Sequence, residues 1–260
     1  MRAAEFLGAR PDPDQAWRLA VGRQHHGAFG GAFGGLLAAG CVVAARSAAP
    51  GRAPVSLDCR FLRAVAAGEI RFVPVVLHAG RSLACVSVDV FDEEGRLASR
   101  GTVSLVSPDA LEHRDHAGAA GRGEPPPAWA TGRVWAHPPG GAAPIIDTLE
   151  PRAVARDERG VATALRVPWD EPGRGAEAAC LAGDMCVGPP VAGAFPGDPK
   201  PAPNPDLSLR FVGEAVGSEV VGYGRLERMA AGVAAVRIEV WSAAKLLAIG
   251  VSCSLLVPPR

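Results

Sequence analysis

The stretch LDCRFLRAVAAGEIRFVPVVLHAGRSLACVSVDVFDEEGRLASRGTVSLVSP, residues 57–108, returns as LSLRFVGEAVGSEVVGYGRLERMAAGVAAVRIEVWSAAKLLAIGVSCSLLVP, residues 207–258. The two copies align at a constant offset of 150 without a gap, and twelve of the 52 aligned positions are identical. Shared alanine and valine content explains several identities, but conservative pairs such as Val88 and Ile238 keep the same register. The repeat indicates that one structural unit occurs twice in the chain.

Each copy has the pattern of an antiparallel sheet. In residues 55–62 apolar and polar side chains alternate, which is the period of a strand with one buried face. Pro74 predicts an edge position or a bulge in the second strand, and the acidic, glycine-ended segment 92–95 predicts a turn. The predicted strands are residues 55–62, 69–78, 82–91 and 96–106 in the first copy, and 206–212, 219–228, 232–241 and 246–257 in the second.

A helix is predicted before the strands of each copy. Residues 28–45 carry no charge and reach the lower limit for a membrane span, but their many glycines favour a buried helix packed closely on a sheet. Residues 177–194 are apolar and interrupted by Pro189-Pro190. We therefore predict an α+β fold of two fused units, each a long central helix wrapped by an antiparallel sheet. The predicted boundaries are an N-terminal unit at 1–108, a Pro/Gly-rich linker at 109–141 and a C-terminal unit at 142–260.

The composition narrows the class of protein. Lysine plus arginine and aspartate plus glutamate each total 27, so the net charge of zero argues against a nucleic-acid partner. The six cysteines lack CxxC spacing and lie mostly in apolar runs, which indicates buried thiols in a reducing compartment. The first ten residues include charges and no apolar signal segment. We expect a cytoplasmic protein without a membrane span.

Four short segments, taken in order, resemble a known family. They are Phe29-Gly30-Gly31, Phe61-Leu62-Arg63, Gly80-Arg81-Ser82 and Leu181-Ala182-Gly183-Asp184. Together with the repeat, they are similar to the TesB-type acyl-CoA thioesterases, which are double hotdog proteins. The resemblance implies a hydrolase of fatty acid metabolism that converts acyl-CoA to free acid and CoA. It also implies that CoA is present only as part of the substrate and that no separate cofactor is used.

The same resemblance implies a set of catalytic residues. Asp184 matches the family's aspartate that orients or activates water, a role for which a carboxylate is suited. The simpler interpretation of Asp184 is an acid that caps the start of a helix. The family's hydroxyl residue falls on Asn204, or on Ser208 if the loop is shifted, and its glutamine falls on Ser252. Ser252 is shorter than glutamine, and ordinary loop and strand polarity is the simpler interpretation of both Asn204 and Ser252.

The residues expected to bind substrate are less specific. Gly30 and Gly31 are expected to bring the thioester close to a helix N-terminus, whose backbone N–H groups stabilise an oxyanion. The first helix carries no acid, so one active site per chain is expected. Further predicted contacts are Phe29, His26, Arg63 and Arg81, with arginines on the phosphates of CoA.

The remaining histidines do not predict a metal. His25 and His26 are expected to face solvent near the mouth of the site. His113 and His116 have His-x-x-His spacing, but they lie in a charged linker without the other ligands of a zinc site.

Two other functions stay open from the sequence. An enoyl-thioester hydratase or dehydratase of the hotdog fold needs an acid/base pair, for which His25 or His26 is the only candidate in the first unit. A non-catalytic acyl-thioester binding protein would explain why serine replaces the family's glutamine. The sequence also leaves open whether the chain forms a homo-oligomer.

Overall fold

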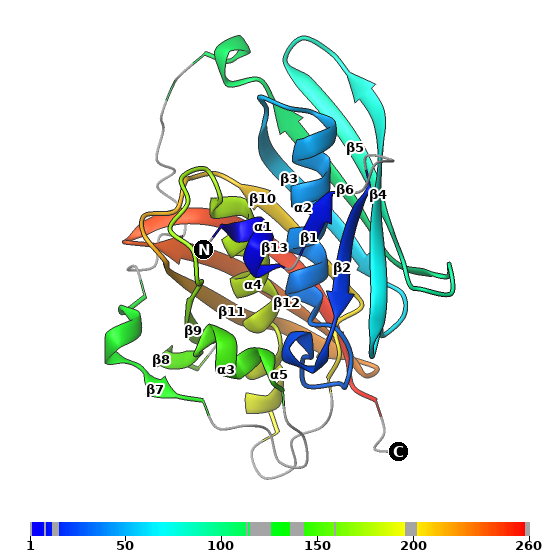
Figure 1. The fold of residues 1–260 in the computed structure, drawn as a ribbon. Helices are drawn as coiled ribbons and strands as arrows, with labels where there is room; N and C mark the ends of the chain where they lie inside the picture. Colours follow the sequence, from blue (N-terminus) through cyan, green and yellow to red (C-terminus); the bar gives the residue numbers. More distant parts are fainter. Residues whose placement is uncertain are drawn as a thin grey trace.

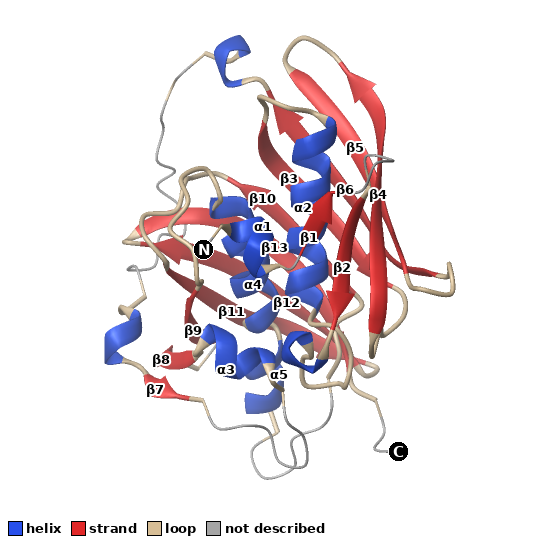
Figure 2. Ribbon diagram, viewed as in Figure 1, coloured by secondary structure: helices blue, strands red, loops and turns tan. Residues whose placement is uncertain are grey.

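A computed structural model describes residues 2–7, 9–11, 16–112, 114, 126–135, 143–158, 160–195 and 202–257. Within these residues the strands form one antiparallel sheet of 13 strands in the order β1-β2-β4-β5-β6-β3-β10-β13-β12-β11-β9-β8-β7. The sheet curves around two central helices, α2 and α4 (Figures 1 and 2). This is the double hotdog arrangement predicted from the repeat.

The first half of the sheet belongs to the N-terminal unit. Its outer strands β1 and β2 were not predicted, because each is short and lies outside the repeat. The elements are α1 (Ala3–Phe6), β1 (Ala9–Pro11), β2 (Trp17–Val21), η1 (Arg23–His25), α2 (Gly34–Ala48), β3 (Ala53–Phe61), β4 (Gly68–Ala79), β5 (Leu83–Phe91), β6 (Leu97–Val106) and η2 (Pro108–Ala110). The four predicted strands are confirmed to within two residues at each end.

The second half repeats this plan. Its elements are η3 (Trp129–Thr131), β7 (Arg133–Val134), α3 (Ile145–Leu149), β8 (Arg152–Arg156), β9 (Gly160–Arg166), α4 (Gly175–Met185), α5 (Gly188–Gly193), β10 (Asp206–Phe211), β11 (Glu219–Ala230), β12 (Val233–Ser242) and β13 (Lys245–Leu255). The helix predicted at 177–194 is two helices, and α5 begins beside the predicted Pro189-Pro190 break. Residues 129–134, predicted as linker, instead contribute η3 and an edge strand of the sheet.

The two units join through their equivalent strands. β3 pairs antiparallel with β10, and Asp58 lies opposite Ser208. These two residues occupy the same position in the repeat, so a local two-fold axis passes between them. The strand pairing makes one continuous sheet from two copies of a unit, and it brings the helices of both units to the same side.

Helices α2 and α4 run antiparallel, and a glycine at their contact allows the two backbones to approach closely. A Cβ added at Gly35 would lie 2.9 Å from the carbonyl oxygen of Cys180 and 3.0 Å from the Cα of Leu181, so a larger residue would push the helices apart. α4 also lies close to its sheet, since a Cβ at Gly222 would lie 2.4 Å from the carbonyl oxygen of Ala182. The predicted close packing of the glycine-rich helix on its sheet is seen at Gly40, where an added Cβ would overlap the ring of Phe72 on β4.

Two expectations about the glycine-rich segment have different outcomes. The helix begins at Gly34 and not at residue 28, because Gly30 has a φ of 73°, a left-handed conformation that interrupts a helix. In the described residues no helix is long and apolar enough to span a membrane. Pro74 lies two residues beyond Phe72, the last residue of β4 paired with β2, so among the described residues β4 has a free edge there, as predicted for proline.

Candidate active site

Asp184 lies in the last turn of α4 and faces the first turn of α2. The expectation that it opens a helix is wrong, because α4 starts nine residues earlier at Gly175 and Cys186 caps its end. Its position follows from the antiparallel packing of the two helices, which sets the C-terminal end of α4 against the N-terminal end of α2. A carboxylate at this point meets the unpaired N–H groups and positive dipole end of α2.

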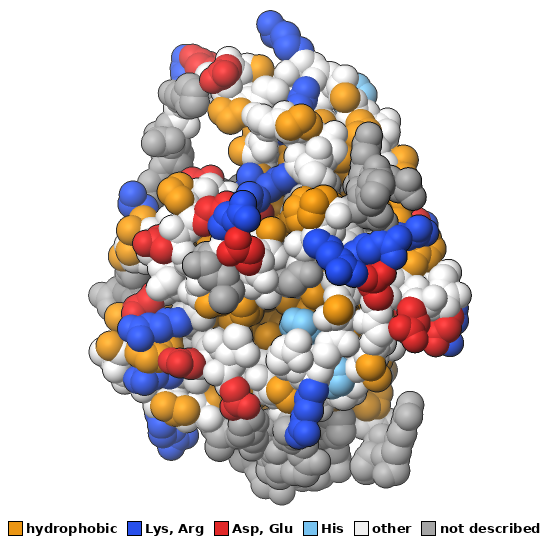
Figure 3. Space-filling view, viewed as in Figure 1, with side chains coloured by type: hydrophobic (Ala, Val, Ile, Leu, Met, Phe, Trp, Pro, Cys, Tyr) orange, Lys and Arg blue, Asp and Glu red, His pale blue; other side chains and the backbone are white. Residues whose placement is uncertain are grey.

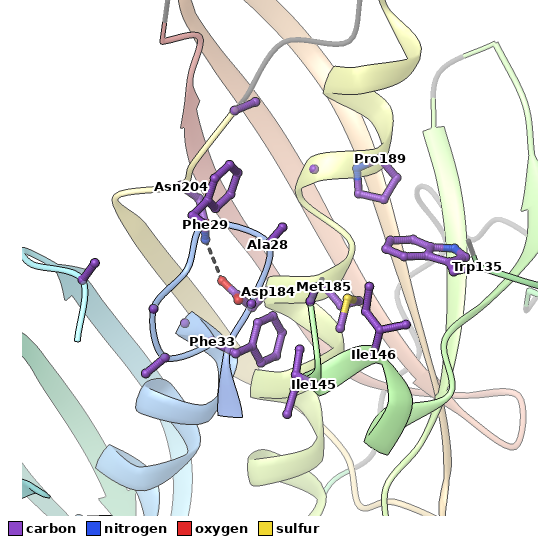
Figure 4. Close-up of a pocket in the computed structure, with 18 of the residues that line it drawn as sticks. Ala28, Phe29, Phe33, Trp135, Ile145, Ile146, Asp184, Met185, Pro189 and Asn204 are labelled. Carbon is purple, nitrogen blue, oxygen red and sulfur yellow. Dashed lines mark hydrogen bonds between the residues drawn. The ribbon is translucent and has the colours of Figure 1, made fainter. Parts of the chain in front are cut away.

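Two neutral donors hold the carboxylate. The backbone N–H of Gly35 donates to Oδ2 of Asp184 at 2.8 Å, and the side-chain amide of Asn204 donates to Oδ1 at 2.6 Å (Figure 4). The same amide lies 3.3 Å from the carbonyl oxygen of Asp206 at the start of β10, which fixes its orientation. The sequence-predicted pair Asp184 and Asn204 is therefore in direct contact.

Burial raises the pKa of Asp184 to about 6. The hydrogen bonds from Asn204 and Gly35 favour the charged form and lower the pKa, but they offset only part of the desolvation. Asp184 is only 7% exposed to solvent. A carboxyl group with a pKa near the working pH is suited to exchanging a proton with a bound water.

The carboxylate borders a cavity of about 660 Å³ between the two units. In Figure 3 apolar side chains gather in a hollow on this face of the molecule, and charged side chains lie around it. The cavity is lined by Gly27, Ala28, Phe29, Gly31, Ala32, Phe33, Gly34, Ala64, Trp135, Ala143, Ile145, Ile146, Asp184, Met185, Gly188, Pro189, Ala192, Ala202 and Asn204. A mostly apolar cavity with a few polar groups at one point is typical of a small-molecule site.

The chain is similar to known proteins in part of its sequence and in its fold. Residues 23–106 match the model of the acyl-CoA thioesterase N-terminal domain. That match agrees with the resemblance to acyl-CoA thioesterases drawn from the sequence. No match is found among curated proteins.

Solved structures show the fold of the whole chain. A tesB protein of Mycobacterium avium subsp. paratuberculosis is 17% identical with a TM-score of 0.75, covering 98% of both chains. Acyl-CoA thioesterase II TesB2 of Mycobacterium marinum is 17% identical with a TM-score of 0.74, covering 99% of this chain and 98% of its own. A hot dog fold protein of unknown function from Alicyclobacillus acidocaldarius is 20% identical with a TM-score of 0.79, covering 100% of both. These likenesses confirm the double hotdog fold.

The third predicted catalytic residue, Ser252, does not line the cavity. It is 3% exposed on β13, and its hydroxyl donates to the carbonyl oxygen of Asp206 at 2.7 Å. In the described structure it makes no hydrogen bond with Asp184. Ser208, the alternative to Asn204, lies on β10 with its side chain on the opposite face from the buried Leu207 and Leu209.

The loop before α2 contributes Phe29 and Gly31 to the cavity wall, as expected. Gly30 does not line the cavity, and its role is conformational, at the left-handed position of the turn. Gly31 lies against the loop that follows β3, since an added Cβ would be 3.0 Å from the Cβ of Ala64. The helix N-terminus that was expected at Gly30 and Gly31 lies instead at Gly34 and Gly35.

The two histidines before the loop are not the solvent-facing pair that was expected. His25 is 9% exposed, and its Nδ1 accepts a hydrogen bond from the Gly22 N–H at 3.1 Å. Burial lowers the pKa of His25, and the neighbouring His26 lowers it further. His26 is half-buried, and its carbonyl oxygen accepts the N–H of Ile145 at 3.1 Å. Neither side chain lines the cavity.

The two predicted arginines have different positions. Arg63 is exposed and precedes Ala64, which lines the cavity, so it lies at the rim. Arg81 lies in the β4–β5 turn, where the Arg52 side chain binds the carbonyl oxygen of Gly80. Arg52 precedes β3, whereas the cavity is at the other end of that strand. Arg81 is therefore remote from the cavity.

Sequence reasoning missed much of the apolar wall. Trp135, Ile145 and Ile146 line the cavity, but they come from a segment read as linker or as the start of the second unit. The apolar run Ala143-Pro144-Ile145-Ile146 after the Pro/Gly-rich stretch was the available signal. His113 and His116 lie outside the described residues. Among the residues that are described, no cluster of three or more His, Cys, Asp or Glu is placed to hold a metal ion.

Proposed function

We propose that this chain hydrolyses acyl-CoA thioesters by means of a water molecule positioned by Asp184. The observation that carries the proposal is the buried Asp184 carboxylate, held by Gly35 and Asn204 at the edge of an apolar cavity. The acyl-CoA thioesterase domain match over residues 23–106 supports the same reaction. CoA takes part only as the leaving group of the substrate, so no separate cofactor is required.

The proposed reaction has two steps. The Asp184 carboxylate accepts a proton from water while the water oxygen attacks the thioester carbonyl carbon, which gives a tetrahedral oxyanion. The carbon–sulfur bond then breaks, and the proton on Asp184 passes to the departing CoA thiolate, leaving free acid and CoA. No covalent bond to the protein forms, and the carboxylate is regenerated.

The start of α2 is suited to stabilising the oxyanion. Gly34 lines the cavity beside Asp184, and within the described residues its N–H has no acceptor. An N–H group in the first turn of a 15-residue helix also has the positive end of the helix dipole behind it. The N–H of Gly35, the next residue, donates to Asp184 and so places the carboxylate beside the N–H of Gly34.

The hydratase alternative needs a histidine in the cavity. Neither His25 nor His26 lines it, so no observation favours a hydratase. Cytoplasmic location and a role in fatty acid metabolism remain part of the proposal. The location is supported by the free state of all six cysteines, four of them fully buried, as expected in a reducing compartment.

The test is thiol release from short, medium and long acyl-CoA substrates with wild type and Asp184→Asn. We expect the variant to lose about 10²–10⁴-fold in kcat, the usual contribution of a positioned general base. Asp58→Asn is the matched control, because Asp58 is a partly exposed carboxylate on β3 that does not line the cavity, and its surface ion pair with Arg210 contributes little to stability. Full turnover by Asp184→Asn contradicts the assigned base, and no turnover by folded wild type contradicts the proposed reaction.

A further inference from the structure

A short strap, residues 129–135, passes around the edge of the sheet from one face to the other. Trp129 is buried in a small cluster with Ala164 and Trp241, whereas Leu165, the next residue of β9, belongs to the main core with the helices. Successive residues of a strand point to opposite faces, so Trp129 lies on the outer face. Trp135, six residues later, packs against the main core on the inner face.

The outer end of the strap is clamped. The guanidinium carbons of Arg152 and Arg166 lie 3.5 and 3.6 Å from the ring centroid of Trp129, which two groups reach only from opposite faces of the ring. The indole N–H of Trp129 donates to the carbonyl oxygen of Glu150 at 2.9 Å. Arg166 is fixed in turn by an ion pair with Glu219 at 2.9 Å. A clamp of this kind holds the strap at a defined position along the edge strand.

The inner end of the strap places Trp135 in the cavity wall. Its backbone N–H donates to the carbonyl oxygen of Pro151 at 3.1 Å, directly after the pairing of β7 with β8. The indole lines the cavity together with Ile146 and Met185. In Figure 4 these two residues lie between Asp184 and Trp135, so the indole stands on the far side of the apolar wall from the carboxylate.

Asp184 divides the cavity into two parts. On one side are Phe29, which is 55% exposed, and Ala64, which is exposed and adjoins Arg63. On the other side Ile145 and Ile146 are 1% and 8% exposed and the wall is apolar. A charged CoA group suits the open side with its rim arginine, whereas an acyl chain gains free energy on the buried apolar side.

We propose that Trp135 sets the length of acyl chain that the cavity accepts, and that the Trp129 clamp is the positioning element that keeps it there. The proposal rests on the proposed thioesterase function, because it assigns the apolar side of that cavity to the acyl chain. A rigid indole at a fixed distance from Asp184 blocks chains that extend past Ile146 and Met185. Specificity is thereby carried by a segment outside the sequence repeat.

The experiment compares kcat/KM over saturated acyl-CoA substrates of increasing length for wild type, Trp135→Phe and Trp135→Ala. We expect the preferred length to increase from wild type to Phe to Ala, with a gain of about fourfold in kcat/KM for each added methylene that becomes buried. Val134→Ala is the matched control, because Val134 is the adjacent strap residue, is 65% exposed and does not line the cavity. An unchanged length profile in both Trp135 variants, with wild-type activity on short chains, overturns the proposal.

Two further variants keep the proposal testable if Trp135→Ala is unstable. Ile146→Phe narrows the same side of the cavity and should shift the preferred length to shorter chains. Trp129→Leu removes the clamp without touching the cavity, and it should broaden the length profile while leaving kcat on short chains unchanged. A profile that stays fixed in both variants contradicts the proposal.

A binding measurement separates this inference from the proposed reaction. Dissociation constants of free fatty acids of graded length are measured by isothermal titration with wild type and Trp135→Ala. If wild type binds fatty acids in a length-dependent way that the variant changes, but hydrolyses no acyl-CoA, only the proposed reaction fails. If hydrolysis is present and the binding profile is the same in both proteins, only the role of Trp135 fails.

Discussion

The two ends of the α2–α4 helix pair each hold one buried carboxylate of α4, in opposite chemical surroundings. At one end Asp184 is held by the neutral donors Gly35 and Asn204 and borders the cavity. At the other end Glu177 is fully buried and pairs with two cations, Arg46 and Arg174, both at 3.0 Å. The same helix therefore carries one carboxylate whose charge is poorly compensated and one whose charge is neutralised.

The end with Glu177 is also sealed by the N-terminus of the chain. Glu171 pairs with Arg174 at 3.0 Å and accepts the N–H of Ala3 at 2.9 Å, which brings α1 over this end. The local two-fold repeat would allow a site at either end of the helix pair. Ion pairing and the N-terminal segment occupy one end, whereas the cavity lies at the other.

The largest effect on stability is expected at the sealed end. Glu177→Gln removes the carboxylate paired with Arg46 and one of the two carboxylates paired with Arg174, and the two arginine side chains are only 20% and 28% exposed. Breaking this pairing should lower the free energy of unfolding by about 2–3 kcal/mol, less than the roughly 3–5 kcal/mol of a fully buried pair, because the arginines are partly hydrated. Urea unfolding at pH 7.5 measures this. A loss below about 0.5 kcal/mol, the usual size of the effect of a surface substitution, contradicts the comparison.

At the cavity end, replacing the buried carboxylate is expected to raise the free energy of unfolding instead of lowering it. The folded-state pKa of Asp184 is raised from 3.8 to about 6, so folding favours the protonated form and stability falls as pH rises from about 4 to about 6. The full cost at higher pH is about 3 kcal/mol. Asp184→Asn removes this cost but keeps only part of the hydrogen bonding, so it should stabilise the protein by about 1–2 kcal/mol at pH 8.

Unfolding of wild type and Asp184→Asn at pH 5 and pH 8 checks this second prediction. The advantage of the variant should be larger at pH 8, where Asp184 in wild type is ionised. Equal stability differences at the two pH values would falsify the raised pKa. A destabilised variant at pH 8 would mean that the lost hydrogen bond to Gly35 or Asn204 outweighs the desolvation cost.

The repeat made most of the sheet predictable from the sequence. The strand period and the constant offset of 150 fix eight strands, because side-chain alternation is a local property that both copies share. The start of α2 was not predictable from composition, since glycine and alanine occur on both sides of Gly34. The left-handed φ of Gly30 keeps this residue out of the helix, and the presence of glycine alone does not predict that conformation.

The candidate site was predictable only in part. The family resemblance identified Asp184 and Asn204, and the structure brings them into contact. Trp135 was missed because it follows a Pro/Gly-rich stretch. Its position depends on the pairing of β7 with β8, and no local sequence pattern predicts that contact. Ser252 has the inward position expected from strand alternation, but the nearby carbonyl oxygen of Asp206 takes its hydroxyl.

A smaller effect should be seen in the pH profile of Asn204→Ala. If Asp184 is the base, kcat rises with pH through the pKa of its carboxyl, which burial raises to about 6. Removing the Asn204 hydrogen bond takes away the main influence that lowers this pKa, so the rising limb should move up by about one pH unit. The rate above the limb should fall less than in Asp184→Asn. A limb that moves down, or stays in place, contradicts Asn204 as the partner of the base.

The smallest effect is expected for Ser252→Ala, and it decides between two roles for that residue. The hydroxyl donates to the carbonyl oxygen of Asp206 and lies outside the cavity wall, so its loss should cost about 1 kcal/mol of stability and leave the rising limb of the pH profile in place. The family resemblance instead gives Ser252 a direct share in orienting water. A loss of kcat of about 100-fold, the lower range for a group acting in the transition state, would restore that role. Because Asn204→Ala moves the limb and Ser252→Ala does not, the pair of variants separates a residue that holds the base from one that holds the start of β10.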